Sequence, residues 1–259
     1  MRTSLELAGR RFSLGPFLKC PHPEMVEACG LAGFDFAVAD MEHTPLSPRD
    51  LYPLVLAAER RALELVVRVP ANEESYIKWC LDLGVRYIQV PFVQCREDAE
   101  KAMSHGYFGP AGERGLCRFV RSADFSAEDR AAYLPRANAQ TKMILQVEGV
   151  RGVENIDEIL AVPGIDTLFI GPYDLSQSLG KPGQIWDDEV VAMMRRIVRA
   201  CDAAGVKAGT FTDTPEGIRF WMTQGVQLIE YASDLNLFMG AVTALKQQVV
   251  GLVGSAPAI

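Results

Sequence analysis

Short apolar runs alternate along the chain with longer segments in which apolar residues recur at helical spacing. Runs rich in β-branched and apolar residues are typical of buried strands, and the 3.6-residue period is typical of amphipathic helices. The predicted strands are residues 12–19, 34–41, 64–70, 86–93, 141–149, 166–172, 207–213 and 226–233. The predicted helices are residues 23–32, 47–61, 72–83, 96–105, 152–161, 187–204, 214–224 and 235–251.

Boundary signals support this division of the chain. Capping residues precede several predicted helices, as in Ser47-Pro48 and Thr214-Pro215, and glycines such as Gly205 and Gly225 follow others. Strands that alternate with helices pair in parallel through right-handed crossovers. Eight such units predict a (β/α)8 TIM barrel formed by residues 1–259 as a single domain, with an open doubly wound sheet as the alternative.

One segment, residues 106–140, is too long for a simple connection between a helix and the next strand. It contains Gly112 and Gly115, a basic stretch and a short predicted helix near residues 126–134. Long excursions in compact folds are usually functional or pack against a partner. We expect this segment near the mouth of the site; a phosphate-binding role for the two glycines is the weaker interpretation.

Composition narrows the function classes. The 259 residues are 49% hydrophobic and 23% charged, as in globular proteins, and the net charge of −7 gives no reason to bind nucleic acid or anionic lipid. No secretory signal or membrane span is recognisable, so we expect a cytoplasmic protein without a membrane partner. The six cysteines form no Cys-x-x-Cys pair, which predicts free, mostly buried thiols.

The carboxyl ends of barrel strands meet at one rim, where TIM barrels place their chemistry. Glu148 and Asp174 end neighbouring predicted strands, and two carboxylates without a histidine or cysteine beside them suit Mg²⁺ or Mn²⁺ rather than zinc. Gln146 lies on the same face of its strand as Glu148. The purely structural alternatives are a helix cap for Asp174 and a salt bridge for Glu148.

Two further polar residues end predicted strands. Arg68 lies in an apolar strand, where burial requires an anionic partner, either a substrate or a structural carboxylate. His43 follows Asp40 by three residues, so that this carboxylate could fix the tautomer of the imidazole and raise its basicity; a hydrogen-bonded structural histidine is the alternative. For His22 and His105 we expect ordinary surface roles.

Lysine positions favour metal chemistry over an imine. A Schiff-base aldolase needs a lysine in the barrel mouth, and Lys19 is the only lysine that ends a predicted strand.

Several motifs, taken together, resemble one known family. The segments are Phe34–His43 (FDFAVADMEH), Val67–Pro70 (VRVP), Pro110–Gly115 (PAGERG), Gln146–Glu148 (QVE) and Gly171–Ser176 (GPYDLS). In this order they resemble the HpcH/HpaI family of metal-dependent, class II pyruvate aldolases, which includes 2,4-dihydroxyhept-2-ene-1,7-dioate and 2-keto-3-deoxy sugar acid aldolases. The resemblance runs from about residue 14 to residue 240.

The resemblance implies a role for each matching position. Glu148 and Asp174 would hold a divalent metal (Mg²⁺, Mn²⁺ or Co²⁺), Arg68 would stabilise an enolate, and His43 would be the base, with Asp40 and Asp82 raising its basicity. Gln146 and the backbone from Gly171 to Asp174, which includes Pro172 and Tyr173, would hold the pyruvyl unit. The family fold implies a homohexamer, a trimer of dimers that exchange their eighth helix, with sites at subunit interfaces.

The resulting hypothesis is a carbon–carbon lyase that reversibly cleaves a 4-hydroxy-2-oxo acid to pyruvate, or a close analogue, and an aldehyde, in aromatic or sugar-acid catabolism. Tyr173 and Phe17 stand where many relatives have a small residue and a tryptophan, so the aldehyde is left open. The alternatives are an oxaloacetate decarboxylase, a CoA-ester lyase, or a catalytically silent barrel that binds a metabolite.

Overall fold

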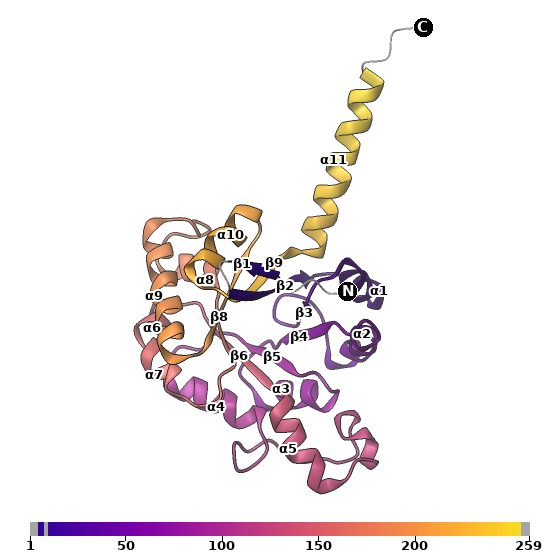
Figure 1. Ribbon diagram of the computed structural model, residues 1–259, viewed down its shortest axis with the longest axis vertical. Helices are drawn as coiled ribbons and strands as arrows, with labels where there is room; N and C mark the ends of the chain where they lie inside the picture. Colours follow the sequence, from indigo (N-terminus) through magenta and orange to yellow (C-terminus); the bar gives the residue numbers. More distant parts are fainter. Residues whose placement is uncertain (1–4, 8–9, 255–259) are drawn as a thin grey trace.

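The computed structural model describes residues 5–7 and 10–254, and it forms a closed barrel of eight parallel strands (Figure 1). Each strand pairs with the next along the chain, and the last pairs with the first. The barrel strands are β2 (Arg10–Leu18), β3 (Phe36–Asp40), β4 (Glu64–Arg68), β5 (Tyr87–Val90), β6 (Lys142–Val147), β7 (Thr167–Ile170), β8 (Lys207–Thr212) and β9 (Leu228–Ser233). The predicted TIM barrel is confirmed.

Helices follow the strands, as predicted, with local differences. They are α1 (Pro23–Ala32), α2 (Pro48–Arg61), α3 (Glu74–Asp82), α4 (Arg96–Gly106), α5 (Arg130–Gln140), α6 (Val150–Glu154), α7 (Ile156–Leu160), α8 (Pro172–Ser178), α9 (Asp188–Ala204), α10 (Pro215–Gln224) and α11 (Asp234–Gly254), with a 3₁₀ segment η1 (Arg121–Ser126). The predicted helix 152–161 is divided into α6 and α7. Neither α8 nor a short strand β1 (Leu5–Leu7), antiparallel to β2, was predicted.

Side chains on the two faces of the barrel form separate apolar layers. Outward-facing residues pack between the sheet and the helices, while a smaller set fills the barrel interior: Phe17, Phe36, Val38, Val66, Ile144, Phe169 and Leu228. Side chains of successive strand residues alternate between the two faces. The inward positions nearer the carboxyl ends are polar and buried, and they include Asp40, Arg68, Gln89, Gln146 and Glu230.

The segment 106–140 covers the amino-terminal end of the barrel, which corrects the expectation that it lies at the site mouth of its own chain. Helix α4 runs back toward the strand starts, and the chain must then reach the first residue of β6 at that same end. Gly112 serves a close backbone approach: a Cβ there would lie 2.5 Å from the Tyr107 carbonyl oxygen. A steric need therefore explains this glycine without a phosphate.

Helix α11 extends away from the barrel (Figure 1), and its apolar side chains are exposed. The exposed residues are Leu235, Leu237, Phe238, Met239, Val242, Leu245, Val249, Val250 and Leu252. Exposed apolar patches of this kind mark surfaces that bind other molecules. Within the described ranges, no helix has the length and apolarity needed to cross a membrane.

All six cysteines are free thiols, as predicted. Only half of them are buried, namely Cys29, Cys80 and Cys201, whereas Cys20 and Cys117 are exposed. The expectation that most are core residues is therefore only partly met.

Candidate active site

A cavity of about 370 Å³ opens at the carboxyl ends of the strands. Most of the predicted site residues line it: His43, Arg68, Gln146, Gly171, Pro172, Tyr173 and Asp174. They come from β4, β6 and α8 and from the loop after β3, so barrel closure brings together residues that are far apart in sequence.

Glu148, the residue after β6, lies at the carboxyl end of the barrel, and two hydrogen bonds hold its carboxylate. Its Oε1 accepts a hydrogen bond of 2.9 Å from the backbone N–H of Phe92, and its Oε2 accepts one from the Gln146 side-chain amide. The side chain is buried, and burial, together with the charges of Glu42 and Asp174, raises its pKa to about 7. The structure shows no salt bridge from Glu148 to a described basic residue.

Two backbone features make room for this carboxylate. Phe92, which donates to it, has a φ of 60°, an uncommon conformation for a bulky residue, although its ring is exposed. Gly171 lies against the other side: a Cβ there would be 2.6 Å from Glu148 Oε2. The position of Glu148 therefore depends on a strained residue on one side and a glycine on the other.

Asp174 lies in the first turn of α8 and faces the cavity. The structural interpretation of Asp174 as a helix cap is wrong, because the N-cap is Gly171 and no side chain caps this helix. An acidic side chain in a first turn is favoured by the helix dipole. The carboxylate is thus available to a ligand in the cavity.

Glu42 joins these two acids and was not among the predicted site residues. Burial raises its pKa, and the charge of Asp174 adds to that effect, while the charges of Arg68 and His43 oppose it. Its position two residues beyond Asp40, and so on the same face of an extended chain, is the sequence signal that could have identified it.

Arg68 and Asp40 form a buried, two-pronged ion pair. Arg68 Nε donates to Asp40 Oδ1 over 2.9 Å and Nη2 donates to Oδ2 over 2.8 Å, while Lys19 Nζ also contacts Oδ2. Although burial alone would raise the pKa of Asp40, the Arg68 guanidinium and then Lys19 hold it well below its usual range. The guanidinium also lies over the ring of Phe17, 4.8 Å from its centroid.

The partners predicted for His43 are not the observed ones. The one hydrogen bond from His43 to Asp40 comes from the backbone N–H, at 3.3 Å, and not from the imidazole. The Asp40 carboxylate also accepts hydrogen bonds from the Arg68 and Lys19 side chains. The imidazole is mostly exposed, and its Nε2 lies 3.8 Å from Glu42 Oε2. Within one chain, the assignment of Asp40 as the carboxylate that orients His43 is therefore wrong.

Asp82 lies at the other end of the barrel from this rim. It is the last residue of α3, just before β5 begins, and its Oδ1 accepts a 2.7 Å bond from Arg114. A helix that follows a strand returns to the amino-terminal end. Asp82 can therefore reach a His43 only from a second copy of the chain.

The acids at the rim fit a hard divalent cation. In the described part of the chain, no group of three or more His, Cys, Asp or Glu side chains is arranged around one metal position, so a cation at this rim would take at most two ligands from such side chains. Glu148 and Asp174 supply carboxylate oxygens, which Mg²⁺ and Mn²⁺ prefer, and a cation would favour the charged form of Glu148, whose pKa is raised first by burial and then by the neighbouring acids. Water and substrate would complete its shell.

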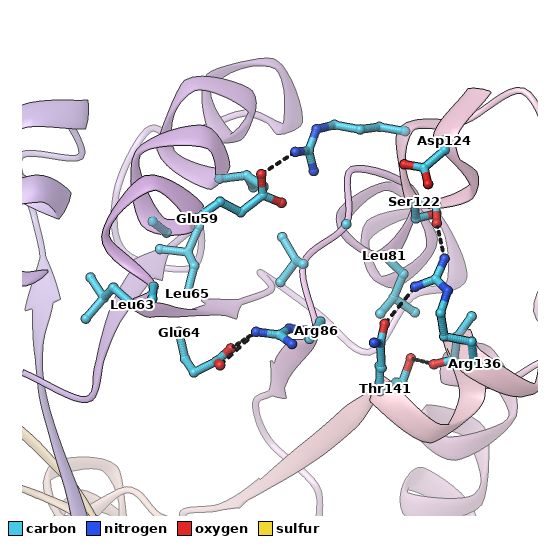
Figure 2. Close-up of a pocket in the computed structure, with 18 of the residues that line it drawn as sticks. Glu59, Leu63, Glu64, Leu65, Leu81, Arg86, Ser122, Asp124, Arg136 and Thr141 are labelled. Carbon is cyan, nitrogen blue, oxygen red and sulfur yellow. Dashed lines mark hydrogen bonds and ion pairs between the residues drawn. The ribbon is translucent and has the colours of Figure 1, made fainter. Parts of the chain in front are cut away.

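A larger cavity, of about 700 Å³, lies at the amino-terminal end, lined by residues from α2, from the strand starts and from the segment 106–140. Figure 2 shows Glu64 bound to Arg86 at this cavity. Its other arginines also have carboxylate partners: Arg114 with Asp82, Arg121 with Glu59 and Arg136 with Glu128. This pairing makes it the weaker candidate for chemistry.

Comparisons with known proteins agree with this site. Residues 13–241 match the family model described as HpcH/HpaI aldolase/citrate lyase. The chain is 35% identical to a 2-dehydro-3,6-dideoxy-6-sulfogluconate aldolase of Pseudomonas putida, over 90% of each protein. It is 33% identical to a 5-keto-4-deoxy-D-glucarate aldolase of Shigella dysenteriae, over 92% of this chain and 93% of that protein. A crystal structure of an HpcH/HpaI aldolase/citrate lyase family protein from Burkholderia cenocepacia superposes with a TM-score of 0.88 at 36% identity, over 92% of this chain and 94% of the other.

Proposed function

The chain belongs to the HpcH/HpaI aldolase/citrate lyase family and is a carbon–carbon lyase, and we propose that it cleaves a 4-hydroxy-2-oxo acid to pyruvate and an aldehyde with the help of a divalent cation. The observation that carries this proposal is the buried carboxylate of Glu148, which lies near two further acids, Glu42 and Asp174, at the carboxyl rim. The names of the two aldolases cited above describe oxidised deoxy sugar acids as their substrates, which supports an oxo acid as the substrate class.

Glu148 and Asp174 would hold the cation. When bound, a divalent cation supplies Lewis-acid polarisation of a keto oxygen. Gln146 and the backbone turn from Gly171 to Asp174 line the same cavity and would orient the 2-oxo acid.

Cleavage begins with loss of the proton from the C4 hydroxyl group. The C3–C4 bond then breaks, its electron pair stays on C3, and the C4 carbon leaves as the aldehyde. Negative charge develops on the C2 oxygen, and the guanidinium of Arg68, held in place by Asp40, would stabilise it. Uptake of a proton at C3 completes pyruvate.

His43 would move these protons. It lines the cavity, its ring is accessible, and Glu42 lies beside its Nε2. A contribution of Asp82 to this histidine requires a second copy of the chain, which fits a site at a subunit interface.

An aromatic wall would receive the aldehyde part of the substrate. The rings of Phe17 and Tyr173 each lie 5.9 Å from that of Phe211, between centroids. The Tyr173 hydroxyl group is 3.4 Å from Asp213 Oδ2. Because these side chains line the cavity, they would decide which aldehydes fit.

We propose that α11 packs on a second copy, as in the helix-exchanged dimers expected of the family, and that these dimers assemble into a hexamer. The uncovered apolar side chains of α11 support this assignment.

Exchange of the pyruvate methyl protons in D₂O, followed by NMR, tests the proposed reaction without an aldehyde. The wild-type protein with Mg²⁺ or Mn²⁺ should exchange them, and His43→Ala should lower the rate by about 10²- to 10⁴-fold, the usual worth of a general base. The His43 side chain is mostly exposed, so this variant should fold. Wild-type protein without exchange would favour a silent barrel. Retro-aldol cleavage of a panel of 4-hydroxy-2-oxo acids would then define the aldehyde.

A covalent mechanism has one candidate at this rim, Lys19. Its amine is engaged by Asp40, which disfavours attack on a ketone. Borohydride added with pyruvate should therefore leave the mass of the protein unchanged. A stable mass increase that disappears in Lys19→Arg would replace the metal mechanism with an imine.

A further inference from the structure

Glu230 lies in the barrel interior, and the proposed reaction does not use it. The residue is on β9, its side chain is fully buried, and the residues registered beside it on the flanking strands are Gly15 and Phe211. One oxygen, Oε2, accepts a long hydrogen bond of 3.5 Å from Gln89 Nε2, and the other, Oε1, has no partner among the described residues. Such a carboxyl group is costly to bury as an anion.

Two glutamines continue from Glu230 toward the carboxyl rim. Gln89 Nε2 donates to Gln146 Oε1 over 2.6 Å, and Gln146 Nε2 donates to Glu148 Oε2. Gln89 thus donates from its amide nitrogen both to Glu230 and to Gln146, and Gln146 donates onward, so that the hydrogen bonds beyond Gln89 run toward Glu148. This row of hydrogen bonds, Glu230–Gln89–Gln146–Glu148, is called the amide chain below.

The amide chain lacks a donor at its inner end. Gln89 Oε1 is buried and, within the described part of the chain, accepts no hydrogen bond. An ionised Glu230 accepts the Gln89 N–H but has no proton to give, and it would leave its own Oε1 and the Gln89 amide oxygen as two unsatisfied buried acceptors. A protonated Glu230 has one O–H group, and the amide whose N–H it accepts carries the unsatisfied oxygen that this O–H group would serve.

The charged groups around Glu230 do not provide another solution. Arg68 is the nearby cation, but its guanidinium binds Asp40 with two hydrogen bonds and lies 3.2 Å from Glu42 Oε2. Burial raises the pKa of Glu230 to about 8, while Arg68 and the hydrogen bond from Gln89 oppose the rise and Asp40 adds to it. The electrostatics agree with the geometry of the two unsatisfied oxygens.

We propose that Glu230 is a positioning residue whose protonated carboxyl group donates to Gln89 and thereby sets the direction of the amide chain that ends at Glu148. With the direction set, Gln146 presents its N–H to the Glu148 carboxylate. Reversal of the amides would turn the Gln146 oxygen toward that carboxylate, which is repulsive. The inference rests on the proposed function, because it assigns Glu230 to the support of a metal ligand.

Calorimetric titration of metal-free protein with Mn²⁺, without substrate, tests this role. Loss of an outer partner of a metal ligand typically weakens metal binding 10- to 100-fold, and Glu230 is further removed. We expect Glu230→Leu and Gln89→Leu each to weaken Mn²⁺ binding about 3- to 10-fold, and the double variant to be no weaker than either one. Glu230→Gln, which is uncharged and keeps an N–H donor, should bind Mn²⁺ within about twofold of wild type.

Each other outcome has a distinct meaning. If Glu230→Gln binds Mn²⁺ as weakly as Glu230→Leu does, the negative charge of Glu230 is needed. If both leucine variants bind Mn²⁺ as tightly as wild type, Glu230 has no role in metal binding. Either result overturns the proposal. A wild-type protein that binds no Mn²⁺ would instead overturn the metal site itself. Infrared difference spectra between wild type and Glu230→Gln should show the C=O stretch of a protonated carboxylic acid at neutral pH. Absence of that band rejects the proposal even where a leucine variant fails to fold.

Discussion

At the scale of single residues, the buried pair of Arg68 and Asp40 organises the floor of the candidate site. Two parallel hydrogen bonds hold the guanidinium in one orientation, which a lysine ammonium, with its single point of charge, cannot reproduce. The pair therefore fixes the direction from which positive charge meets the substrate.

Arg68→Lys tests this geometry. The lysine keeps the positive charge but loses the two parallel hydrogen bonds of the guanidinium. We therefore expect kcat/KM for 2-oxo acid cleavage to fall about 10²- to 10³-fold, as when one donor to a developing oxyanion is removed. Arg86→Lys is the matched control, since Arg86 makes a similar contact with Glu64, exposed at the opposite end of the barrel, and its substitution should leave kcat/KM near wild type. Full activity in Arg68→Lys would show that charge alone suffices.

Glu230 gives stability a pH dependence. Its folded pKa of about 8 lies above the value of an exposed glutamate, so the folded protein binds the proton more tightly than the unfolded protein does. The stability that this proton contributes is complete below about pH 4 and is lost as pH rises toward 8. Relative to Glu230→Gln, wild type should lose about 1 kcal/mol of unfolding free energy per pH unit between about pH 5 and 8. Urea denaturation measures this difference, and parallel curves would contradict it.

Sequence patterns identified the polar residues that end strands but not the polar residues that lie deeper in the barrel interior and contact them. Arg68, Gln146, Glu148 and Asp174 stand out as polar residues at the ends of apolar runs, and the structure places them at one cavity or beside it. Gln89 and Glu230 stand within strands, where a polar residue could face either side. The partners of Asp40 and Asp82 depend on which distant arginine reaches them, and no local pattern encodes that.

At the scale of elements, the turn from β7 into α8 builds much of the rim. Gly171 caps α8 and Pro172 begins it, and the helix places Asp174 in its first turn. Because α8 follows the strand directly and is short, its residues could be taken for the polar end of a strand, which explains why the sequence analysis assigned no helix there.

Gly171→Ala tests the fit between this turn and Glu148. The added methyl group would lie 2.6 Å from Glu148 Oε2 and 2.8 Å from its Cβ, so the carboxylate must move. We expect Mn²⁺ binding to weaken at least tenfold, while thermal unfolding still shows one cooperative transition. Gly149→Ala, on the same rim, meets nothing nearer than the Ser178 hydroxyl group at 3.8 Å and serves as the control. Equal affinity in both variants would contradict the proposed position of Glu148.

At the scale of the whole molecule, the barrel follows from the count of strand–helix units, whereas the assembly does not. Eight units close in order, with each strand beside its sequence neighbours. Helix α11 extends away from the barrel with its apolar side chains exposed, and the proposal that a second copy covers them concerns an assembly that the strand–helix count does not encode.

Leu245→Glu tests the assignment of α11 to an interface. Burying a leucine contributes about 1.5–3 kcal/mol, and a buried, unpaired carboxylate costs more, so we expect the mass in solution to fall below that of the wild-type oligomer. Light scattering coupled to size-exclusion chromatography gives both masses. A monomeric wild type, or a variant of unchanged mass, would contradict the proposed helix exchange.

The central claim, that Glu148 and Asp174 hold a divalent cation required for cleavage, is tested most directly by removing and restoring the metal. Pyruvate formation from a 4-hydroxy-2-oxo acid should cease after EDTA treatment and gel filtration, and should return on addition of Mg²⁺, Mn²⁺ or Co²⁺. Glu148→Gln and Asp174→Asn, which keep the shape but not the charge of each ligand, should not regain activity. Undiminished activity in the stripped wild-type protein, or full recovery in either variant, would contradict the account.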